Sequence, residues 1–217
     1  AQAPGIENLQ KYDRLEIREL DPNLWNNRMM AHKIENIRNF YRSLKEGTRV
    51  LVLDTDLIFK NNPFDMFEEG EANIYYTSRY YKYHFPINAG VWGFIKTKNT
   101  DLFLLDYIKQ INNPTWDKLL KFRKKHNRTS CKNWWVDQDY LCVVNNNLKE
   151  IESKFSVKIF DVGSKYNFCP STDIMGIDKS VHHIKAALKN DDIKIIHFKS
   201  NLKYLINLED LKCELSK

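Results

Sequence analysis

The stretch between Arg49 and Asp56 constrains the fold of this chain more than any other. Four consecutive apolar residues, Val50 to Leu53, run directly into one aspartate, and a second aspartate follows two positions later. A short apolar run rich in Val and Leu is typical of a strand that is buried on both faces. The sequence therefore predicts a central strand that ends in Asp54-Thr55-Asp56.

The two carboxylates after this strand indicate a cation site. Residues two apart in an extended chain point to the same side, and open α/β sheets bind ligands beyond the carboxyl ends of their strands. Asp54 and Asp56 would repel each other there unless a cation lies between them. Their hard oxygen atoms suit Mn²⁺ or Mg²⁺, which also bind phosphate oxygens. A purely structural explanation, turn-forming aspartates after a buried strand, stays open because Asp137-Gln138-Asp139 repeats the spacing.

Length and composition favour one globular domain over residues 1–217. A chain of 217 residues can bury a substantial core, and no apolar run reaches the length of a membrane span. The formal net charge of +6 favours anionic partners, such as a phosphorylated ligand, an anionic membrane surface or nucleic acid. The four cysteines show no C-x-x-C spacing, which argues against structural zinc and favours free thiols in a reducing compartment.

The alternation of predicted strands and helices favours an α/β sandwich with a central, mostly parallel sheet. Bounded apolar runs predict further strands at 14–20, 72–77, 87–95, 157–160 and 193–198. Helical spacing of apolar residues predicts helices at 28–44, 99–111 and 206–215. In the helix at 99–111, we expect Leu102, Leu105, Ile108 and Ile111 on the inner face.

Four short motifs occur in one order along the chain. They are Asp54-Thr55-Asp56, Asn88-Ala89-Gly90, Asp137-Gln138-Asp139, and His197 with Lys203 six residues later. Each has a simple structural explanation by itself: a strand-opening turn, a helix cap, a structural histidine or a surface lysine. Together, their order and spacing resemble the retaining galactosyl- and glucosyltransferases of the glycogenin-like family, glycosyltransferase family eight, which have the GT-A fold.

The resemblance extends over roughly residues 28–205. It implies one glycosyltransferase catalytic domain over residues 1–217, which moves a hexose from a UDP-sugar in a metal-dependent reaction. In that family the Asp-x-Asp motif and a late histidine hold Mn²⁺, so Asp54, Asp56 and His197 are the implied ligands of Mn²⁺ or Mg²⁺. The residues that the resemblance implies for donor binding are Lys33, Asp54, Asn88, Ala89, Gly90 and Lys203.

The resemblance also implies the catalytic pair, Asp137 and Gln138, because an Asp-Gln pair lies beside the reacting carbon in that family. Departure of an anionic diphosphate is helped by a divalent metal acting as a Lewis acid and by the charge of Lys203. Gln138 offers a weakly basic amide oxygen near the anomeric carbon, and no separate acceptor base is then needed. The product is therefore expected to keep the anomeric configuration of the donor.

The chain departs from the family pattern in three places. Ser200 stands where the family usually has Gly, and Tyr204 and Leu205 follow Lys203 where the family has Pro-Trp. Only residues 1–48 precede the central strand, where the family has room for a complete nucleotide-binding unit. The resemblance therefore implies a GT-A domain with a reduced N-terminal nucleotide-binding part, in which Lys33 contacts the nucleotide.

Two other functions stay open on the sequence alone. A nucleotidyltransferase also uses carboxylates to bind metal and phosphates, although the seven glycines form no Gly-rich phosphate loop. A non-catalytic module that binds nucleotide sugars or nucleic acid fits the basic charge, although no nucleic-acid motif occurs.

The favoured enzyme has the partners that its reaction requires. It would take a UDP-sugar and a glycan, lipid-linked saccharide or protein acceptor, and no nucleic acid. We expect it in the cytoplasm, with peripheral membrane association through its basic surface, or in the Golgi lumen if an anchor was removed.

Overall fold

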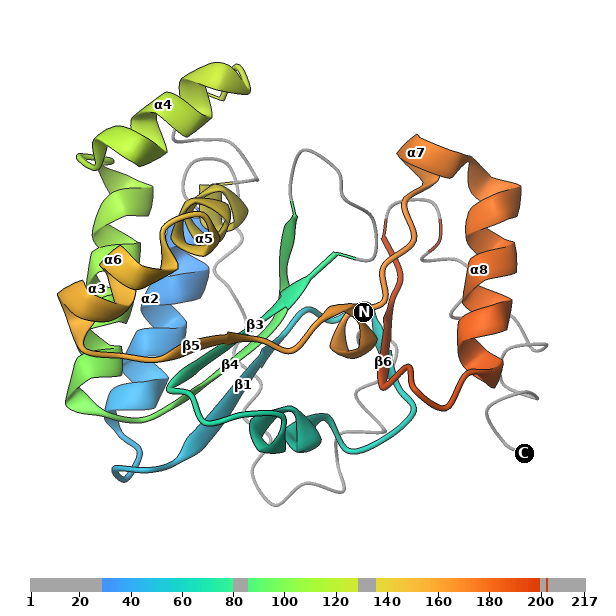
Figure 1. Ribbon diagram of the computed structural model, residues 1–217, viewed down its shortest axis with the longest axis horizontal. Helices are drawn as coiled ribbons and strands as arrows, with labels where there is room; N and C mark the ends of the chain where they lie inside the picture. The colour runs from blue at the N-terminus through green and yellow to red at the C-terminus, as the bar shows by residue number, and fades with distance from the viewer. Residues whose placement is uncertain (1–28, 80–85, 129–135, 200–201, 203–217) are drawn as a thin grey trace.

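The computed structural model describes residues 29–79, 86–128, 136–199 and 202, and the strands within them form a four-stranded and a two-stranded sheet (Figure 1). The strands are β1 (Arg49–Leu53), β2 (Leu57–Phe59), β3 (Ile74–Ser78), β4 (Ile87–Ile95), β5 (Ile159–Asp161) and β6 (Ile195–His197). The helices are α2 (Met29–Arg42), η2 (Pro63–Glu68), α3 (Lys98–Asn112), α4 (Asp117–Lys125), α5 (Val136–Asn145), α6 (Leu148–Phe155), η3 (Ser164–Tyr166), α7 (Thr172–Met175) and α8 (Ile177–Lys189).

The larger sheet has the strand order β1-β4-β3-β5. β4 is antiparallel to both of its neighbours, whereas β3 and β5 are parallel. β1, β3 and β5 therefore run in one direction, with β4 inverted between them. β2 and β6 form the separate antiparallel pair, which extends through a parallel bridge between Phe168 and Ile196.

The expected α/β class is confirmed, but the expectation of a mostly parallel sheet is wrong. Among the named strands of the described residues, β3 and β5 are the one pair that hydrogen-bonds in parallel. The length of the connections explains the difference. Residues 79–86 join β3 directly to β4, and a parallel pairing would need a crossover of about a dozen residues or more.

The two faces of the larger sheet pack against different cores. Ile74 and Tyr76 of β3 belong to the main core, which also includes buried residues of α2, α3, α5 and α6. Tyr75, between them in sequence, packs on the opposite face with Met66 and Phe67 of η2. Because successive side chains of a strand alternate between faces, one short strand can contribute to both cores.

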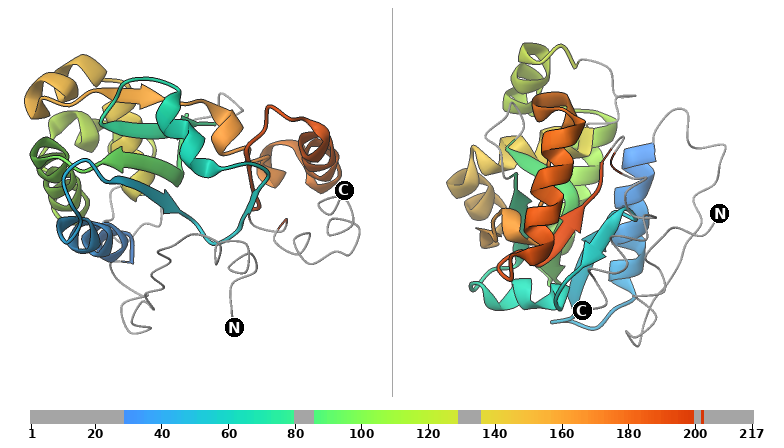
Figure 2. Two further views of the ribbon diagram at one scale, coloured as in Figure 1. Left: turned by 90° about the horizontal axis from the view of Figure 1, so that it is seen from below. Right: turned by 90° about the vertical axis from the view of Figure 1, so that its right-hand side faces the viewer.

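The α-helices lie at two ends of the molecule. α2, α3 and α6 lie at one end of the arrangement, and α8 lies at the other, beside β6 (Figures 1 and 2). α8 packs through a small core of its own, in which Ile184 joins Ile196 and Phe198 of the β6 segment. The junction between the larger sheet and the β2–β6 pair therefore lies between two separately packed regions.

The helix predicted at 99–111 exists as α3, and two of its four predicted inner residues, Ile108 and Ile111, pack on the main core. The other two do not. Leu102 and Leu105 are 45% and 47% exposed, whereas Phe103, Leu104 and Tyr107 are fully buried. Aromatic side chains remove more apolar surface from water than leucines do. The helix is therefore rotated to bury Phe103 and Tyr107, and the Tyr107 ring stacks on Tyr140 with ring centroids 4.4 Å apart.

Several sequence-based expectations fall outside the described residues. They include the strand at 14–20, the helix at 206–215, the N-terminal nucleotide-binding part before residue 29, and Cys131 and Cys213. Cys142 and Cys169 are buried free thiols, as expected. In the part of the chain that the structure covers, no helix combines the length and apolar character that crossing a bilayer requires.

Candidate functional site

The segment Asp54-Thr55-Asp56 links the two sheets. Asp54 directly follows β1, and Asp56 directly precedes β2. The chain bends at Thr55 and Asp56, so the carboxylates converge because the chain passes from one sheet to the other, and not through the strand alternation expected from sequence. The Asp54 amide donates to the Gly90 carbonyl oxygen at 2.8 Å, and the Phe198 amide donates to the Asp56 carbonyl oxygen at 2.9 Å.

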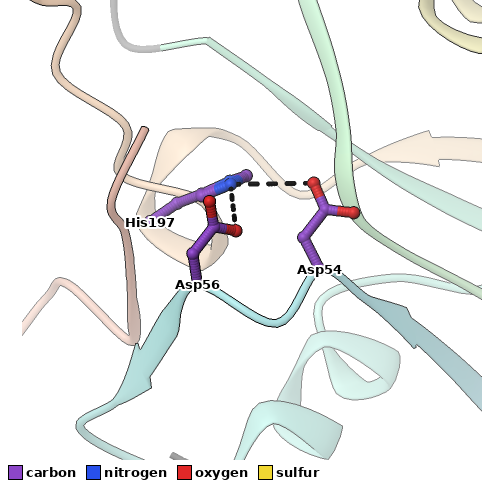
Figure 3. Close-up of side chains that lie close together, drawn as sticks. All are labelled: Asp54, Asp56 and His197. Carbon is purple, nitrogen blue, oxygen red and sulfur yellow. Dashed lines mark ion pairs between the residues drawn. The ribbon is translucent and has the colours of Figure 1, made fainter. Parts of the chain in front are cut away.

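His197, at the end of β6, points toward both carboxylates (Figure 3). Its Nε2 lies 3.0 Å from Asp56 Oδ1 and 3.7 Å from Asp54 Oδ2. One ligand atom from each of the three residues lies within 4.8 Å of the other two. The His197 side chain is fully buried, while those of Asp56 and Asp54 are 13% and 29% exposed. The three residues form a group that is compatible with a divalent metal ion.

The hydrogen bonds of His197 fit such an ion. Nδ1 lies 2.9 Å from Asn167 Oδ1, whereas Nε2 has no hydrogen-bond partner among the described residues. Burial lowers the pKa of His197 below its ordinary value because it disfavours the imidazolium, even though Asp56 and Asp54 act in the opposite direction. A neutral ring that donates through Nδ1 turns the Nε2 lone pair toward two carboxylates. A cation shared by the three groups would satisfy this arrangement.

The Asn88-Ala89-Gly90 motif forms a bulge at the start of β4. Tyr76 of β3 pairs with Trp92 of β4, and Ser78 pairs with Ile87. Between these two pairs β3 advances by two residues and β4 by five, so β4 carries the extra residues. The extra residues bring β4 toward the site, as bulges often do beside functional groups.

Internal hydrogen bonds hold the shape of this bulge. Asn88 Oδ1 accepts a hydrogen bond from the Gly90 amide at 3.0 Å. The Asn88 carbonyl oxygen accepts from the Thr77 hydroxyl at 3.2 Å. The bulge therefore carries its backbone to the metal-ligand group in a fixed shape.

Position 90 requires glycine because there is no room for a Cβ atom, and not because of its backbone conformation. A Cβ atom at this position would lie 2.7 Å from Asp54 Oδ2 and 2.7 Å from His197 Nδ1, and closer still to His197 Cε1. The positive-φ glycines of the described residues are Gly47, Gly163 and Gly176. The glycine of the motif therefore lets β4 lie directly against two of the three candidate ligands.

Lys33 of α2 lies at the same group. Its Nζ donates to Asp54 Oδ1 at 2.8 Å. Burial alone would lower the pKa of Lys33, but the attraction of Asp54, Asp137 and Asp56 outweighs it and raises the pKa. Burial likewise acts to raise the pKa of Asp54, but the positive charge of Lys33 is the largest opposing cause and the pKa is lowered overall. Both groups are therefore charged at neutral pH.

Lys199 was not expected at the site. It follows His197 by two residues, and its Nζ donates to Asn88 Oδ1 at 3.2 Å. The sequence could have indicated Lys199, because residues two apart in an extended segment point to the same side and His197 was already a candidate ligand. Lys203, the lysine that the resemblance implies, lies outside the described residues.

Asp137 and Gln138 occupy the first turn of α5 and are both buried. Burial and the nearby Asp54 carboxylate raise the pKa of Asp137, although Lys33 opposes this shift. Gln138 Oε1 accepts a hydrogen bond from Arg79 at 3.2 Å, and its Nε2 is buried with no partner among the described residues. The amide oxygen expected beside the anomeric carbon is thus already engaged, while the amide nitrogen is available.

The third residue of that motif has a different environment. Asp139 is fully buried, and its Oδ1 accepts from Arg128 at 2.7 Å. Arg123 lies 3.8 Å from its other oxygen. Burial raises the pKa of Asp139 in spite of both arginines. Asp139 therefore belongs to a structural ion pair and not to the metal-ligand group, although its Asp-x-Asp spacing equals that of Asp54 and Asp56.

Lys199 provides a test of the charge at this site. Lys199→Met should raise the dissociation constant of UDP by about tenfold or more, because a charge-assisted hydrogen bond contributes roughly 1.5–3 kcal/mol. Binding of uridine, which lacks the phosphates, should change much less. Isothermal titration calorimetry of both ligands with Mn²⁺ measures the difference. Lys194→Met is the matched control, because the Lys194 ammonium donates to the Asp191 carbonyl oxygen. Equal losses for UDP and uridine would remove Lys199 from the phosphate site.

Comparison with known proteins gives limited matches. No protein-family model matches this chain, and no curated protein is significantly similar to it. Two crystal structures of the glycosyltransferase GlyE from Streptococcus pneumoniae TIGR4, one of them the apo form, are similar at 19% identity and a TM-score of 0.44. The alignments cover 84% and 83% of this chain and 44% of the GlyE chain, so this chain spans less than half the length of those structures.

Proposed function

We propose that this chain is a metal-dependent glycosyltransferase with a GT-A domain. It transfers a hexose from a UDP-sugar to a saccharide, lipid-linked or protein acceptor, with retention of configuration. The observation that carries the proposal is the convergence of Asp54, Asp56 and His197, from distant parts of the chain, on one point beside the Asn88-Ala89-Gly90 bulge. The order of these motifs resembles glycosyltransferase family eight.

Asp54, Asp56 and His197 would hold Mn²⁺ or Mg²⁺. When bound, such an ion supplies a Lewis acid for the oxygens of the departing diphosphate. Lys33 donates to Asp54 and Lys199 donates to Asn88. Their two ammonium groups therefore lie beside the proposed metal and donor site. Fixed positive charge at the place where negative charge develops lowers the barrier to departure. We assign Lys203 the same role on the resemblance.

Two buried amide groups suit the sugar of the donor. Asn88 Nδ2 and Gln138 Nε2 have no hydrogen-bond partners among the described residues, whereas buried polar groups nearly always have one. The hydroxyl groups of a hexose would provide acceptors for both. Ala89 and Gly90 complete the proposed donor contact, because their small side chains let the donor approach the backbone of β4.

Asp137 and Gln138 are the proposed catalytic pair. Asp137 lies close enough to Lys33 and Asp54 for each to shift its pKa, so it borders the proposed donor site and can orient a sugar hydroxyl. Gln138 is held by Arg79, which fixes its amide at the same edge. In this proposal no side chain is needed as the acceptor base, because the departing diphosphate can accept the proton of the acceptor on the same face, and configuration is retained.

Turnover of nucleotide sugars tests the proposal. We expect release of UDP from UDP-glucose or UDP-galactose in the presence of Mn²⁺, and loss of this activity in excess EDTA. Proton NMR of the product formed early should show an α anomer from an α-linked donor, whereas a β anomer would exclude retention. Activity that EDTA leaves unchanged would end the metal assignment. Release of pyrophosphate from a nucleoside triphosphate and a sugar phosphate would identify a nucleotidyltransferase instead.

A further inference from the structure

We propose that Asn167 is a positioning residue that sets the tautomer of His197, so that His197 offers the Nε2 lone pair to a metal ion. That the tautomer serves metal binding rests on the proposed metal centre. Asn167 directly follows η3 and is fully buried. None of the four sequence motifs includes it, and its side chain contacts residues of three strands.

The Asn167 amide makes a complete set of hydrogen bonds. Its Nδ2 donates to Thr77 Oγ1 at 2.8 Å and to the Asn88 carbonyl oxygen at 3.3 Å. Its Oδ1 lies 2.9 Å from His197 Nδ1. Thr77, Asn88 and His197 belong to β3, β4 and β6 respectively, and all three are fully buried.

The directions of these hydrogen bonds are fixed by two backbone carbonyl groups. The Asn88 carbonyl oxygen can only accept, so the Asn167 atom that faces it must be the nitrogen. The Thr77 hydroxyl lies 2.8 Å from the Val91 carbonyl oxygen and 3.2 Å from that of Asn88. It therefore donates its hydrogen to one of them and accepts from Asn167. Asn167 Oδ1 is left facing His197, and an oxygen acceptor there requires the hydrogen on Nδ1.

The opposite tautomer would be incompatible with this network. A hydrogen on Nε2 would require Nδ1 to accept, and the Asn167 amide would have to turn over to supply a donor. Its oxygen would then face the Asn88 carbonyl oxygen, two acceptors in a buried position, which is unfavourable. The network therefore holds a hydrogen on Nδ1, and in the neutral ring the Nε2 lone pair is directed at Asp56 and Asp54, as metal coordination requires.

The backbone holds Asn167 in place independently of its side chain. The Phe168 amide donates to the Ile195 carbonyl oxygen at 3.0 Å, and the His197 amide donates to the Phe168 carbonyl oxygen at 2.9 Å. The segment after η3 is thus hydrogen-bonded along β6. Substitution of the Asn167 side chain should therefore change the tautomer of His197 with little displacement of His197 itself.

Two measurements on purified protein test this role. Two-bond ¹H–¹⁵N correlation NMR of the metal-free protein reports which nitrogen of His197 carries the hydrogen. Electron paramagnetic resonance reports the free Mn²⁺ in a titration without any substrate. We expect the Nδ1–H tautomer in the wild type. Asn167→Leu should shift the population toward Nε2–H, where Asp56 can accept, and should weaken Mn²⁺ binding by about 10–100-fold, as for other residues that orient metal ligands.

A conservative variant and a control separate positioning from general stability. In Asn167→Asp the carboxylate still accepts from Nδ1, so the hydrogen should stay on Nδ1 and Mn²⁺ affinity should stay within about threefold. The other carboxylate oxygen then faces the Asn88 carbonyl oxygen, so this variant should also lose thermal stability. Gln110→Leu is the matched control, because Gln110 is a buried amide whose three hydrogen bonds go to Thr115 and Trp116. It should lower thermal stability and leave both His197 readouts unchanged.

The outcomes decide the inference and the proposed function separately. An Nε2–H tautomer in the wild type, or wild-type Mn²⁺ affinity in Asn167→Leu, overturns the role of Asn167. A wild-type protein that binds no Mn²⁺ overturns the proposed metal centre. The NMR measurement needs no metal, so in that case it still decides whether Asn167 sets the tautomer.

Discussion

Replacement of Asp56 by asparagine should lower the affinity for Mn²⁺ by at least about 100-fold and should abolish measurable turnover. Asp56 Oδ1 is the carboxylate oxygen nearest to His197 Nε2, at 3.0 Å. Asp54 is already paired with Lys33 at 2.8 Å, and Asp56 adds the second carboxylate of the group that attracts a cation. An amide oxygen has the same size but carries no charge, and the divalent ion then loses a strong ligand.

The Asp56→Asn variant should fold normally. The backbone carbonyl oxygen of Asp56 accepts from the Phe198 amide, and this bond does not depend on the side chain. Removal of one of two adjacent carboxylates also relieves repulsion in the metal-free protein. The melting temperature in EDTA should therefore be unchanged or higher than that of the wild type, whereas its increase on addition of Mn²⁺, expected for the wild type, should disappear.

Asp117→Asn is the control for the loss of one negative charge. Asp117 is exposed in the first turn of α4, outside the candidate site. This variant should bind Mn²⁺ as the wild type does in the same paramagnetic resonance titration. If Asp56→Asn retains wild-type affinity, the three-residue group is not the metal centre.

The candidate ligands could be identified from sequence because each follows or precedes a short apolar strand, although β1 lies at the edge of its sheet and is buried on one face only. The run before Asp54 marks β1, and the apolar residues before His197 mark β6, so both side chains are placed at strand ends. Asp54 and Asp56 nevertheless do not converge through alternation along an extended chain, as the sequence had predicted. The chain bends at Thr55 and Asp56 to enter a second sheet, and no local pattern distinguishes such a bend from a continuing strand.

The remaining site residues depend on contacts between distant segments. Asn167 reaches Thr77, Asn88 and His197 only because the segment after η3 runs beside β6, and its own sequence neighbourhood carries no motif. Leu102 and Leu105 were wrongly placed on the inner face of α3 for a related reason. Leucines at helical spacing compete there with Phe103 and Tyr107, and the competition is decided by aromatic partners on α5 such as Tyr140.

Gly90→Ala should remove Mn²⁺ binding as completely as loss of a ligand does, although the variant leaves all three candidate ligands in the sequence. The added Cβ would lie 2.7 Å from Asp54 Oδ2 and would overlap the His197 ring. β4 cannot withdraw easily, because the Gly90 carbonyl oxygen accepts from the Asp54 amide and Val91 pairs with Leu53 of β1. His197 and Asp54 must therefore separate, and overpacking of this kind costs about 1–3 kcal/mol of stability.

Gly93→Ala, in the same strand, separates the loss of the site from the loss of stability. A Cβ at Gly93 would meet the Phe67 ring at 2.8 Å and the Val50 carbonyl oxygen at 3.2 Å, on the side of the sheet that packs against η2. Both variants should lower the melting temperature, and Gly90→Ala alone should lose Mn²⁺ affinity, by about 100-fold or more. Wild-type affinity in Gly90→Ala would mean that Asp54 and His197 can move apart without consequence for the ion. The ion would then be held elsewhere, because the distances from a metal ion to its ligands can vary by only a few tenths of an ångström.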